Sequence, residues 1–595
     1  MSYRAPVTDI LFAMRHVAGL DDGIENGLFA DLGDGMAEAV LEEAAKFAES
    51  RIAPLNRAGD KETSRLVDGQ VKTPAGFKEA YTDWAAGGWA GVAADEQYGG
   101  QGLPILLNIG CTELWNSANL AFALNPLLTM GAIEALAAHG SEFLKSTFLS
   151  KMIAGEWTGT MNLTEPGAGS DLALLTARAE PVGDGTYRVF GQKIFITYGD
   201  HDLTENIVHL VLARLPGAPA GTRGISLFAV PKFLVNADGS LGARNDARCH
   251  ALEHKLGIHG SPTATMIFGD NGGAIGWLVG EENKGLNCMF TMMNNARLAV
   301  GVQGVAVAER AYQQALWYAQ ERKQGKAIGA ANTSAIIEHP DVKRMLLEMR
   351  TKTNAARAIC LATAAALDRA HRLEDAAARK AAFEEASLLT PVAKSFSTDI
   401  GIEVASTGVQ IHGGMGFIEE TGAAQHYRDA RILAIYEGTN GIQAIDLVMR
   451  KLPLSNGDCV KSMITRLRDS AERASIVNEP GFARVGERLG EAVNALERTT
   501  AYMMDALKTR PNDALAGATP YQRLFGLAAG GAFLADQALA ARVALSAGES
   551  DPRHHGRIRD ARFFAENLVT AASGLEQSVM DGAEAVNSAY SADEV

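Results

Sequence analysis

The chain has 595 residues, of which 47% are hydrophobic and 21% are charged, and its formal net charge at pH 7 is −15. Its length suggests roughly three to four domains, and this composition is typical of a soluble globular protein. The acidic balance argues against general affinity for nucleic acid, which requires a basic surface. Abundant alanine and few aromatic residues favour helix.

Cysteine usage and the first residues bear on location. The five cysteines are scattered and form no Cys-x-x-Cys pair, which is typical of a reducing compartment and gives no zinc framework. The start, Met1 to Pro6, has no long apolar segment, so we expect no signal peptide. No uninterrupted apolar run reaches the roughly 18 residues of a membrane span. We therefore expect a cytoplasmic protein without integral membrane association.

The first part of the chain is predicted to be helical. Residues 1–30 form an extension in which Thr8 to Met14 can make one short amphipathic helix that packs on the body. Residues 31–155 follow as an all-helical domain, whose first helix ends at Ile52 because Pro54 stops it. The later helices of this domain are expected at about 105–122, 124–139 and 141–153.

The middle of the chain, residues 156–285, is predicted to be a small sheet domain or barrel. Short β-rich runs bounded by Gly, Pro and Asp give this pattern. The runs are 186–190, 193–197, 207–212, 225–230 and 263–268.

Helix returns in residues 286–452, which we expect to form a four-helix bundle. Its helices are predicted at 286–322, 341–372, 380–407 and 427–450. Pro453, Ser455, Asn456 and Gly457 indicate a linker, and residues 453–595 are predicted to be an additional helical domain.

Three stretches suggest chemistry. In Met161 to Asp171, glycines at 167 and 169 let a ligand approach the backbone, and such a loop can present N–H groups to a phosphate. Taken alone, this Gly-x-Gly is more typical of an ordinary turn. In Gln410 to Gly416, two adjacent glycines offer similar access, and His412 is more typical of a packed residue than of a base. No triad and no metal-ligand spacing accompany it, so we expect no metal site.

The third stretch is Arg431 to Gln443, where an apolar run leads to Tyr436, Glu437 and Gly438. Charged side chains are rarely buried unless paired, so a lone glutamate at this place is either in a surface turn or in a site. Taken by itself, Glu437 is more typical of a solvated turn.

In order along the chain, these stretches resemble the acyl-CoA dehydrogenase family from about Glu38 to Leu452. The resemblance implies a mainly α fold with a central β domain: a helical domain, a β-barrel domain and a four-helix bundle, here with an additional C-terminal helical domain. The length, the opening residues 3–7 and the tail are similar to a narrower subgroup that includes 3-methylmercaptopropionyl-CoA dehydrogenases and broad fatty acyl-CoA dehydrogenases. The motifs that carry it are 98–102, 163–171, 191–197, 318–323, 410–416 and 436–439.

The resemblance implies that Glu437 is the catalytic base of an FAD-dependent dehydrogenation of acyl-CoA to trans-2-enoyl-CoA. Glu437 would remove the α-proton while flavin N5 accepts a hydride from the β-carbon, and electrons would pass to electron-transfer flavoprotein. An apolar pocket raises the pKa of a carboxylate toward that of a useful base, and the apolar run before Glu437 is expected to supply its walls. The backbone N–H of Glu437 and an FAD hydroxyl would bind the thioester oxygen.

The resemblance also implies the binding residues. Phe195 stands where many relatives have Trp, and Gly325 where many have Phe. The expected FAD contacts are Met161, Leu163, Thr164, Gly169, Ser170, Phe195, Ile196, Thr197, Arg322, Gln324, Gln410, Gly414 and Thr439. The expected acyl-CoA contacts are Ser170, Asn294, Arg297, Tyr436 and Gly438.

The roles of two residues and the activity itself allow other interpretations. Asn294 stands where the family has Asp, and Arg297 could instead form a salt bridge on a helix surface. Arg322 would reach the FAD of a second subunit, so we expect a homodimer, with the tail covering the face that simpler relatives use for tetramers. An acyl-CoA oxidase that uses oxygen, or a degenerate member acting as a binding protein, is an alternative function.

Overall fold

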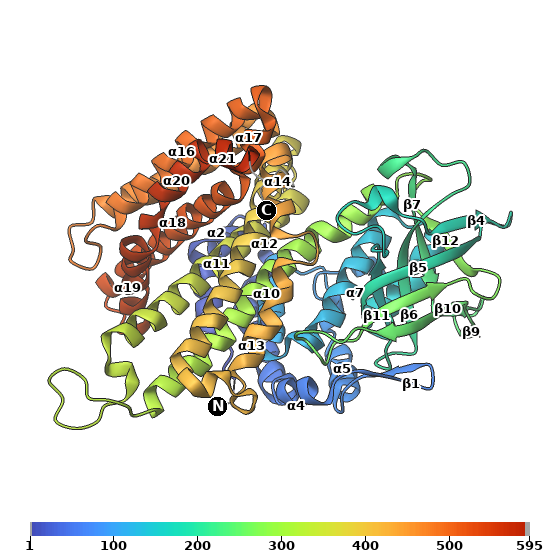
Figure 1. The fold of residues 1–595 in the computed structure, drawn as a ribbon, viewed down its shortest axis with the longest axis horizontal. Helices are drawn as coiled ribbons and strands as arrows, with labels where there is room; N and C mark the ends of the chain where they lie inside the picture. The colour runs from blue at the N-terminus through green and yellow to red at the C-terminus, as the bar shows by residue number, and fades with distance from the viewer. Residues whose placement is uncertain (1–2, 589–595) are drawn as a thin grey trace.

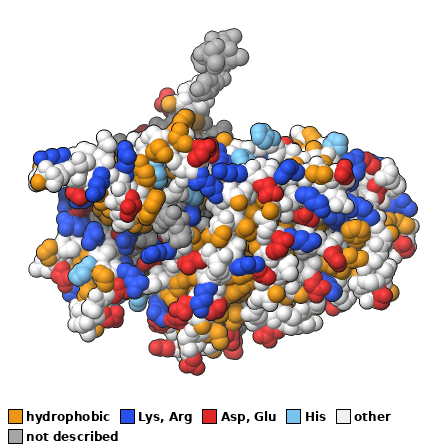
Figure 2. Space-filling view, turned by 90° about the horizontal axis from the view of Figure 1, so that it is seen from below, with side chains coloured by type: hydrophobic (Ala, Val, Ile, Leu, Met, Phe, Trp, Pro, Cys, Tyr) orange, Lys and Arg blue, Asp and Glu red, His pale blue; other side chains and the backbone are white. Residues whose placement is uncertain are grey.

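The computed structural model describes residues 3–588 and shows a mainly helical protein with a β domain at one end (Figure 1). Long helices of a bundle occupy the middle, the β domain lies on one side of them and the C-terminal helices lie on the other. The expected fold class is confirmed. Seen from below, Figure 2 shows acidic and basic side chains interspersed over the visible face.

The N-terminal extension contains the expected amphipathic helix, α1 (Val7–His16). Its apolar face, with Ile10, Leu11 and Met14, is buried. The helix packs between the bundle and the C-terminal helices, and Arg557 of the latter lies 3.7 Å from the ring centre of Phe12. The first residues therefore join two later parts of the chain.

The sequence predicted an all-helical N-terminal domain, but the structure shows that this domain also contains two strands. A hairpin of β1 (Arg65–Val67) and β2 (Gln70–Lys72) lies within it, closed by Asp68-Gly69, both with positive φ. This dipeptide is a strong signal for a β-hairpin. The prediction missed the hairpin because the sequence on both sides of it has a helical pattern. The helices are α2 (Leu20–Glu25), α3 (Met36–Phe47), α4 (Leu55–Glu62), α5 (Phe77–Ala86), α6 (Ile105–Ala118), α7 (Leu120–His139), α8 (Glu142–Leu144) and α9 (Ser150–Ile153).

The break between α6 and α7 falls at Asn119, four residues before the predicted position. The Asn119 side chain accepts a hydrogen bond from the backbone N–H of Phe122, and this N-cap begins the new helix. The helix α3 continues as one π-helical turn to Ile52, just before Pro54, as expected.

The middle domain contains a closed ring of five strands, in the order β5, β12, β7, β6, β4 and back to β5. Strands β11 and β10 extend the sheet from β5, while β3 extends it from β6. The two runs predicted at 186–197 are one continuous strand, β5. The bounds are β3 (Trp157–Asn162), β4 (Arg178–Pro181), β5 (Tyr187–Thr197), β6 (Asn206–Arg214), β7 (Ile225–Pro231), β8 (Phe233–Val235), β9 (Leu241–Arg244), β10 (Ala247–Leu252), β11 (Thr263–Phe268) and β12 (Ala274–Val279).

The bundle has three long helices, α10 (Gly285–Glu321), α11 (Pro340–Arg372) and α12 (Ala376–His412). The prediction of one continuous fourth helix over 427–450 is wrong. Two short helices, α13 (Ala423–Ala430) and α14 (Asn440–Asp446), take its place. Positive φ angles at Glu437 (55°) and Gly438 (84°) are incompatible with a continuous right-handed helix.

The C-terminal residues form the expected helical domain after a turn in which Ser455 and Asn456 have left-handed backbone. Helix α18 packs along α11 and α12. Among residues 3–588, two helices, α7 and α18, are long and apolar enough to cross a membrane, but 83% of the most apolar window of each is buried within the protein. They are core helices. The bounds are α15 (Asp458–Ser475), α16 (Val485–Thr509), α17 (Pro511–Ala516), α18 (Ala518–Ser546), α19 (Pro552–Asn567), α20 (Ala572–Asp581) and α21 (Ala583–Asn587).

Candidate active site

Two backbone segments that the sequence assigned to flavin lie side by side at the edge of the β domain. The Thr160 hydroxyl donates to the carbonyl oxygen of Thr197 at 2.7 Å. The backbone N–H of Ile194 donates to the carbonyl oxygen of Thr164 at 2.9 Å. These bonds place the end of β3 and the residues after it, with Met161, Leu163 and Thr164, beside the end of β5.

Phe195 points out of the barrel because of a β-bulge. Between β5 and β11, Ile196 pairs with Ala264 and Lys193 pairs with Met266, so two residues of β5 oppose one of β11. Phe195 has a φ of 61° and is 59% exposed. Bulges of this kind re-aim a side chain, and here the result is an exposed aromatic ring.

The side chains of Ile196 and Met161 are buried in the core of the β domain. Of the predicted FAD contacts on these strands, these two can therefore offer a ligand mainly their backbone. Thr164 and Thr197 are only partly buried, so their hydroxyl groups lie closer to the surface.

Glu165 organises the Gly-rich loop. It accepts hydrogen bonds from the backbone N–H and hydroxyl of Thr176 at 2.7 and 2.6 Å, and from the backbone N–H of Ala177 at 3.0 Å. The ammonium of Lys193, which is fully buried, lies 2.8 Å from the same carboxylate and 3.1 Å from the carbonyl oxygen of Leu163. Burial alone would raise the pKa of Glu165, but Lys193 and Thr176 lower it below the ordinary value. The loop is thus anchored from inside.

The outer side of this loop is open. A Cβ added at Gly167 or Gly169 would meet no atom within 4 Å, and Ser170 is exposed. Backbone N–H groups and a hydroxyl in such a loop suit a phosphate. The open loop and the exposed ring of Phe195 lie on adjoining segments, as a flavin with its phosphates would need. The residues present therefore fit FAD.

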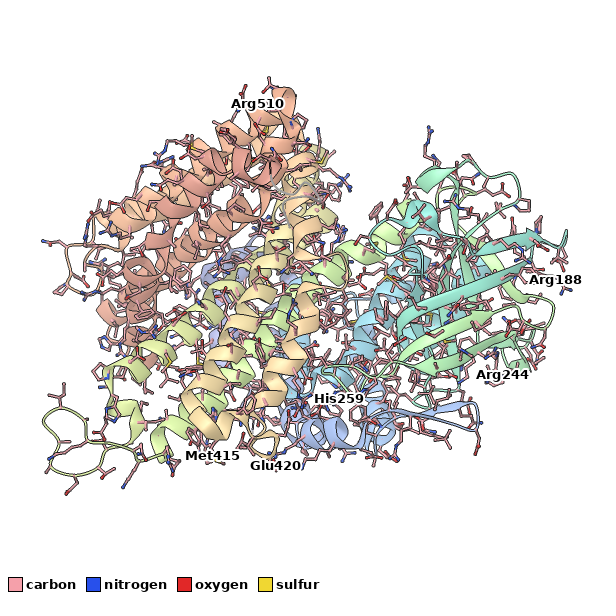
Figure 3. The ribbon with its side chains drawn as sticks, viewed as in Figure 1. Arg188, Arg244, His259, Met415, Glu420 and Arg510 are labelled. Carbon is pink, nitrogen blue, oxygen red and sulfur yellow. The ribbon has the colours of Figure 1, made fainter. Side chains whose placement is uncertain are left out.

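Four of the predicted FAD contacts lie elsewhere, at the end of the bundle away from the β domain. Arg322 and Gln324 lie at the base of a loop that follows α10, and both are exposed. Gln410 and Gly414 lie at the end of α12 and are also exposed. In Figure 3, Met415, the residue after Gly414, marks the lower end of the bundle, and the β domain lies to the right of the bundle. One chain does not bring the two sets together.

Glu437 lies on the left-handed turn between α13 and α14. Such backbone costs a non-glycine residue about 1 to 3 kcal/mol and persists only where the surroundings hold it. The side-chain amide of Gln443 donates to the carbonyl oxygens of Glu437 and Gly438 at 3.3 and 3.4 Å. The hydroxyl of Thr439 accepts from the backbone N–H of Ile442 at 3.3 Å and begins α14.

The surroundings of Glu437 combine burial with two cationic neighbours. Of the apolar run before it, Leu433 is buried in the core and Ile435 is exposed. That this run walls the carboxylate stays a prediction. Burial raises the pKa of Glu437, while the charges of Arg297 on α10 and Lys394 on α12 oppose this. The bundle helices therefore supply the charged neighbours of Glu437.

Arg297 is buried rather than in a surface salt bridge, which corrects the alternative considered for it. Its guanidinium lies 3.5 Å from the carboxylate of Asp446, and both side chains are inside the protein. Tyr436 donates its hydroxyl to Gln303 of α10, whose amide donates to Asn116 of α6 at 3.1 Å. These contacts join the Glu437 segment to two helices.

Asn294 lies on α10 about one turn before Arg297, and its side chain lies outside what the structure describes. His412 is a packed residue, as expected. It stacks on Tyr318 with ring centres 4.4 Å apart, and its Nδ1 lies 2.7 Å from the carbonyl oxygen of Gly408. Burial lowers its pKa, which favours the neutral ring.

Sequence reasoning missed Lys394, Asn440 and Gln443, which surround the turn of Glu437. A signal for Lys394 was present: it is a lone charge on a stretch of α12 that is otherwise apolar or small, and it is fully buried. Gln443 gave no comparable signal, because its contacts depend on the turn.

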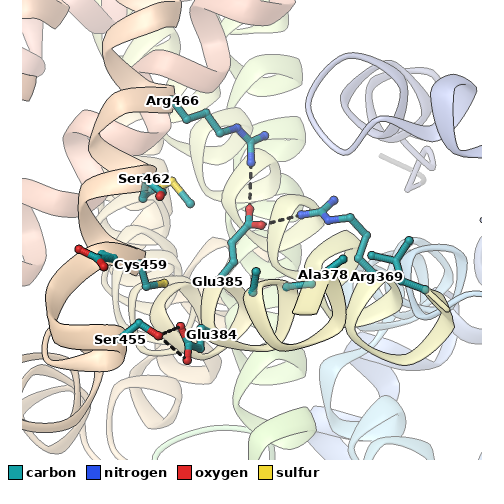
Figure 4. A pocket seen from close by; sticks show the side chains of 13 residues that line it. Arg369, Ala378, Glu384, Glu385, Ser455, Cys459, Ser462 and Arg466 are labelled. Carbon is teal, nitrogen blue, oxygen red and sulfur yellow. Dashed lines mark hydrogen bonds and ion pairs between the residues drawn. The ribbon is translucent and has the colours of Figure 1, made fainter. Parts of the chain in front are cut away.

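A groove of about 580 Å³ lies away from these residues, between α12 and α15 (Figure 4). Arg369 and Arg466 both face it, but each pairs with Glu385, at 2.9 and 3.0 Å. None of the predicted site residues lines this groove.

Known families match almost the whole chain. Three descriptions of acyl-CoA dehydrogenase match in order: the N-terminal domain over residues 36–156, the middle domain over 160–271 and the C-terminal domain over 283–452. A fourth, "Acetyl-CoA dehydrogenase C-terminal like", matches residues 463–589. The chain therefore belongs to the acyl-CoA dehydrogenase family, and it is an acyl-CoA dehydrogenase, an oxidoreductase.

Individual proteins that are similar to this chain also belong to the acyl-CoA dehydrogenases. The chain is 47% identical to 3-methylmercaptopropionyl-CoA dehydrogenase of Ruegeria pomeroyi, covering 98% of each chain. It is 33% identical to the broad-specificity linear acyl-CoA dehydrogenase FadE5 of Mycobacterium tuberculosis, covering 95% of each. The fold is similar to that of an acyl-CoA dehydrogenase from Bacillus anthracis complexed with FAD, with a TM-score of 0.74 and 21% identity over 92% of this chain and 88% of that chain.

Proposed function

We propose that this enzyme binds FAD and converts an acyl-CoA thioester to the trans-2-enoyl-CoA, with Glu437 as the base that removes the α-proton. The observation that carries the proposal is the place of Glu437: a partly buried carboxylate on a left-handed turn, with its pKa raised. When bound, FAD supplies the hydride acceptor at N5. Thr164, Phe195 and Thr197 would hold its ring, and the loop through Ser170 would hold its phosphate side.

The chain's own groups prepare the acyl-CoA. A carboxylate of raised pKa is a stronger base toward the weakly acidic α-proton than an exposed one. The backbone N–H of Glu437 would donate to the thioester oxygen, on which negative charge develops. Tyr436, Gly438 and Arg297 would lie near the bound acyl-CoA.

We propose a homodimer as the working unit. The support is the division of the expected FAD contacts between the β domain and the far end of the bundle. In a dimer, Arg322, Gln324, Gln410 and Gly414 of one subunit can complete the FAD site of the other. An electron-transfer flavoprotein is the proposed electron acceptor, by resemblance to the family. All five cysteines are free thiols, which supports the cytoplasm as the location.

The test is spectroscopic. The purified protein should be yellow, and acyl-CoA added without oxygen should bleach its visible flavin absorption. In air without another acceptor, turnover should yield little peroxide. A folded but colourless protein would contradict the proposal, and stoichiometric peroxide would favour the acyl-CoA oxidase alternative.

For the substrate, we propose 3-methylmercaptopropionyl-CoA as the first candidate, since the chain is 47% identical to a dehydrogenase of that name. A panel of acyl-CoA thioesters from short to long, with and without a thioether, measures this directly. A clear preference for long linear chains would point instead to a broad fatty acyl-CoA dehydrogenase.

A further inference from the structure

A buried lysine and an asparagine connect α12 to the turn that carries Glu437. Asn440 is the first residue of α14, three positions after Glu437. The ammonium of Lys394 donates to the side-chain oxygen of Asn440 at 2.9 Å, and Lys394 is fully buried. The lysine therefore contacts the start of α14, directly after the turn, from inside the bundle.

The other side of the Asn440 amide is held as well. Its nitrogen donates to the carboxylate of Asp399 at 2.7 Å, to the hydroxyl of Thr398 at 3.0 Å and to the carbonyl oxygen of Ser395 at 3.3 Å. All these partners lie on α12. Both the oxygen and the nitrogen of one amide are thus bound to a single rigid helix, which fixes where α14 begins.

The fixed position of the first residue of α14 also restrains the turn of Glu437 and Gly438, which precedes it. Glu437 and Gly438 both have positive φ, and such backbone relaxes unless its two ends are held. Gln443 binds the carbonyl oxygens of the turn from α14. The chain of contacts therefore runs from Lys394 through Asn440 to α14 and back to the backbone of Glu437.

We propose that Lys394 is a positioning residue for the catalytic base: through Asn440 it fixes the left-handed turn of Glu437, and it places a positive charge beside that carboxylate. The inference rests on the proposed role of Glu437 as the base.

The charges around the two groups are consistent with this role. Lys394 faces the carboxylates of Glu437 and Asp399 and the guanidinium of Arg297. Burial lowers the pKa of Lys394 to about 7, against the two carboxylates. Glu437 faces Arg297 and Lys394. Asp399 is further surrounded by Arg523 and Glu403. Below about pH 7, Lys394 therefore carries its charge and favours the ionised form of Glu437.

The experiment compares three variants of the full-length holoenzyme with wild type. The quantity measured is the rate of flavin bleaching at saturating acyl-CoA without oxygen, as a function of pH, together with the FAD content. Lys394→Met removes the charge and the hydrogen bond. Asn440→Ala keeps the charge and removes the connection. Lys352→Met is the matched control, because Lys352 is a buried lysine of the same bundle that pairs with Glu348 and Glu403 instead.

In Lys394→Met, the pH at which the rate falls to half on the acid side should move to higher pH, because the ionised base has lost a positive neighbour. In Asn440→Ala, that pH should stay as in wild type, while the limiting rate falls by about tenfold or more, as for a misplaced catalytic group. Lys352→Met should keep both the wild-type pH profile and the wild-type limiting rate.

The proposal is overturned if Lys394→Met binds FAD and keeps both the wild-type pH profile and the wild-type rate. If Lys394→Met does not fold, Asn440→Ala decides: a wild-type rate overturns the proposal and a reduced rate supports it. Failure of the proposed function has a different signature, since a Glu437→Gln variant would then still bleach its flavin. An inactive Glu437→Gln with unaffected Lys394→Met and Asn440→Ala would contradict the positioning role alone.

Discussion

The carboxylate of Glu437 lies where burial favours its neutral form, while Arg297 and Lys394 favour the ionised form. The balance leaves the pKa above its ordinary value, which suits a group that must take a proton from a weak carbon acid. The left-handed turn places this side chain between α13 and α14. The side-chain amide of Gln443 holds the turn through hydrogen bonds to its carbonyl oxygens. The proposed base is therefore influenced by groups on three helices, α10, α12 and α14.

This balance predicts the pH dependence of flavin reduction. The base works only when ionised, so the rate should fall as pH decreases through the pKa of Glu437. Because burial raises that pKa, the fall should begin at higher pH than for an exposed glutamate, whose pKa is about 4.3. Stopped-flow measurement of anaerobic flavin reduction across pH tests this. A rate that stays constant down to the range of an exposed glutamate would contradict it.

The sequence singled out Glu437 through its resemblance to the family, but only some of the side chains around Glu437 could be predicted. The order of motifs identified the residue, whereas its local pattern favoured an ordinary turn. Burial of Arg297 and the contact of Lys394 depend on which faces of α10 and α12 turn inward around a broken helix. Those directions come from tertiary packing, which a periodic pattern does not specify.

The Gly-rich loop after β3 is an element with a rigid inner side and an open outer side. Glu165 and Lys193 form its inner side, and Gly169 and Ser170 lie on the outer side. The bulge at Phe195 belongs to the same strand as Lys193, so one strand both anchors the loop and presents the aromatic ring. The motif predicted the loop, but the bulge could not be predicted because it arises from the register between β5 and β11.

The inner ion pair gives a second prediction. Lys193→Met leaves the buried carboxylate of Glu165 without its cation, and loss of one partner of a buried pair costs about 3 to 5 kcal/mol. We expect a lower melting temperature by calorimetry and loss of FAD during purification. The double variant Glu165→Gln with Lys193→Met should recover part of the stability, because no unpaired charge remains. Equal melting temperatures for Lys193→Met and wild type would show that the pair does not stabilise the loop.

The whole molecule combines a helical bundle with an extra helical layer, and the N-terminal extension packs against both. Asp560 of α19 pairs with Arg350 of α11 at 2.8 Å, and Arg557 pairs with Asp9 of α1 at 3.2 Å. The helical pattern of the tail predicted this layer, and the residues predicted as a linker form a short turn with left-handed backbone at Ser455 and Asn456. How the layer packs was not readable, because the partner surfaces lie hundreds of residues away in sequence.

The end of the bundle away from the β domain gives a third prediction. Phe417 is 86% exposed there, and Ile328 of the nearby loop is fully exposed, as expected of a surface that a second subunit covers. Phe417→Asp should shift the mass in solution from dimer toward monomer and lower the FAD content. Ile476→Asp is the matched control, because Ile476 is 80% exposed on the C-terminal helices. A dimer that is unaffected by Phe417→Asp would place the subunit contact elsewhere.

Anaerobic single turnover of Glu437→Gln bears most directly on the proposal that Glu437 removes the α-proton. Glutamine keeps the size of the side chain and cannot accept the proton, so the variant should remain yellow and lose bleaching by about a hundredfold or more, in line with the loss of a general base. Glu374→Gln, at an exposed glutamate between α11 and α12, should bleach like wild type. A Glu437→Gln protein that bleaches at the wild-type rate would show that Glu437 is not the base.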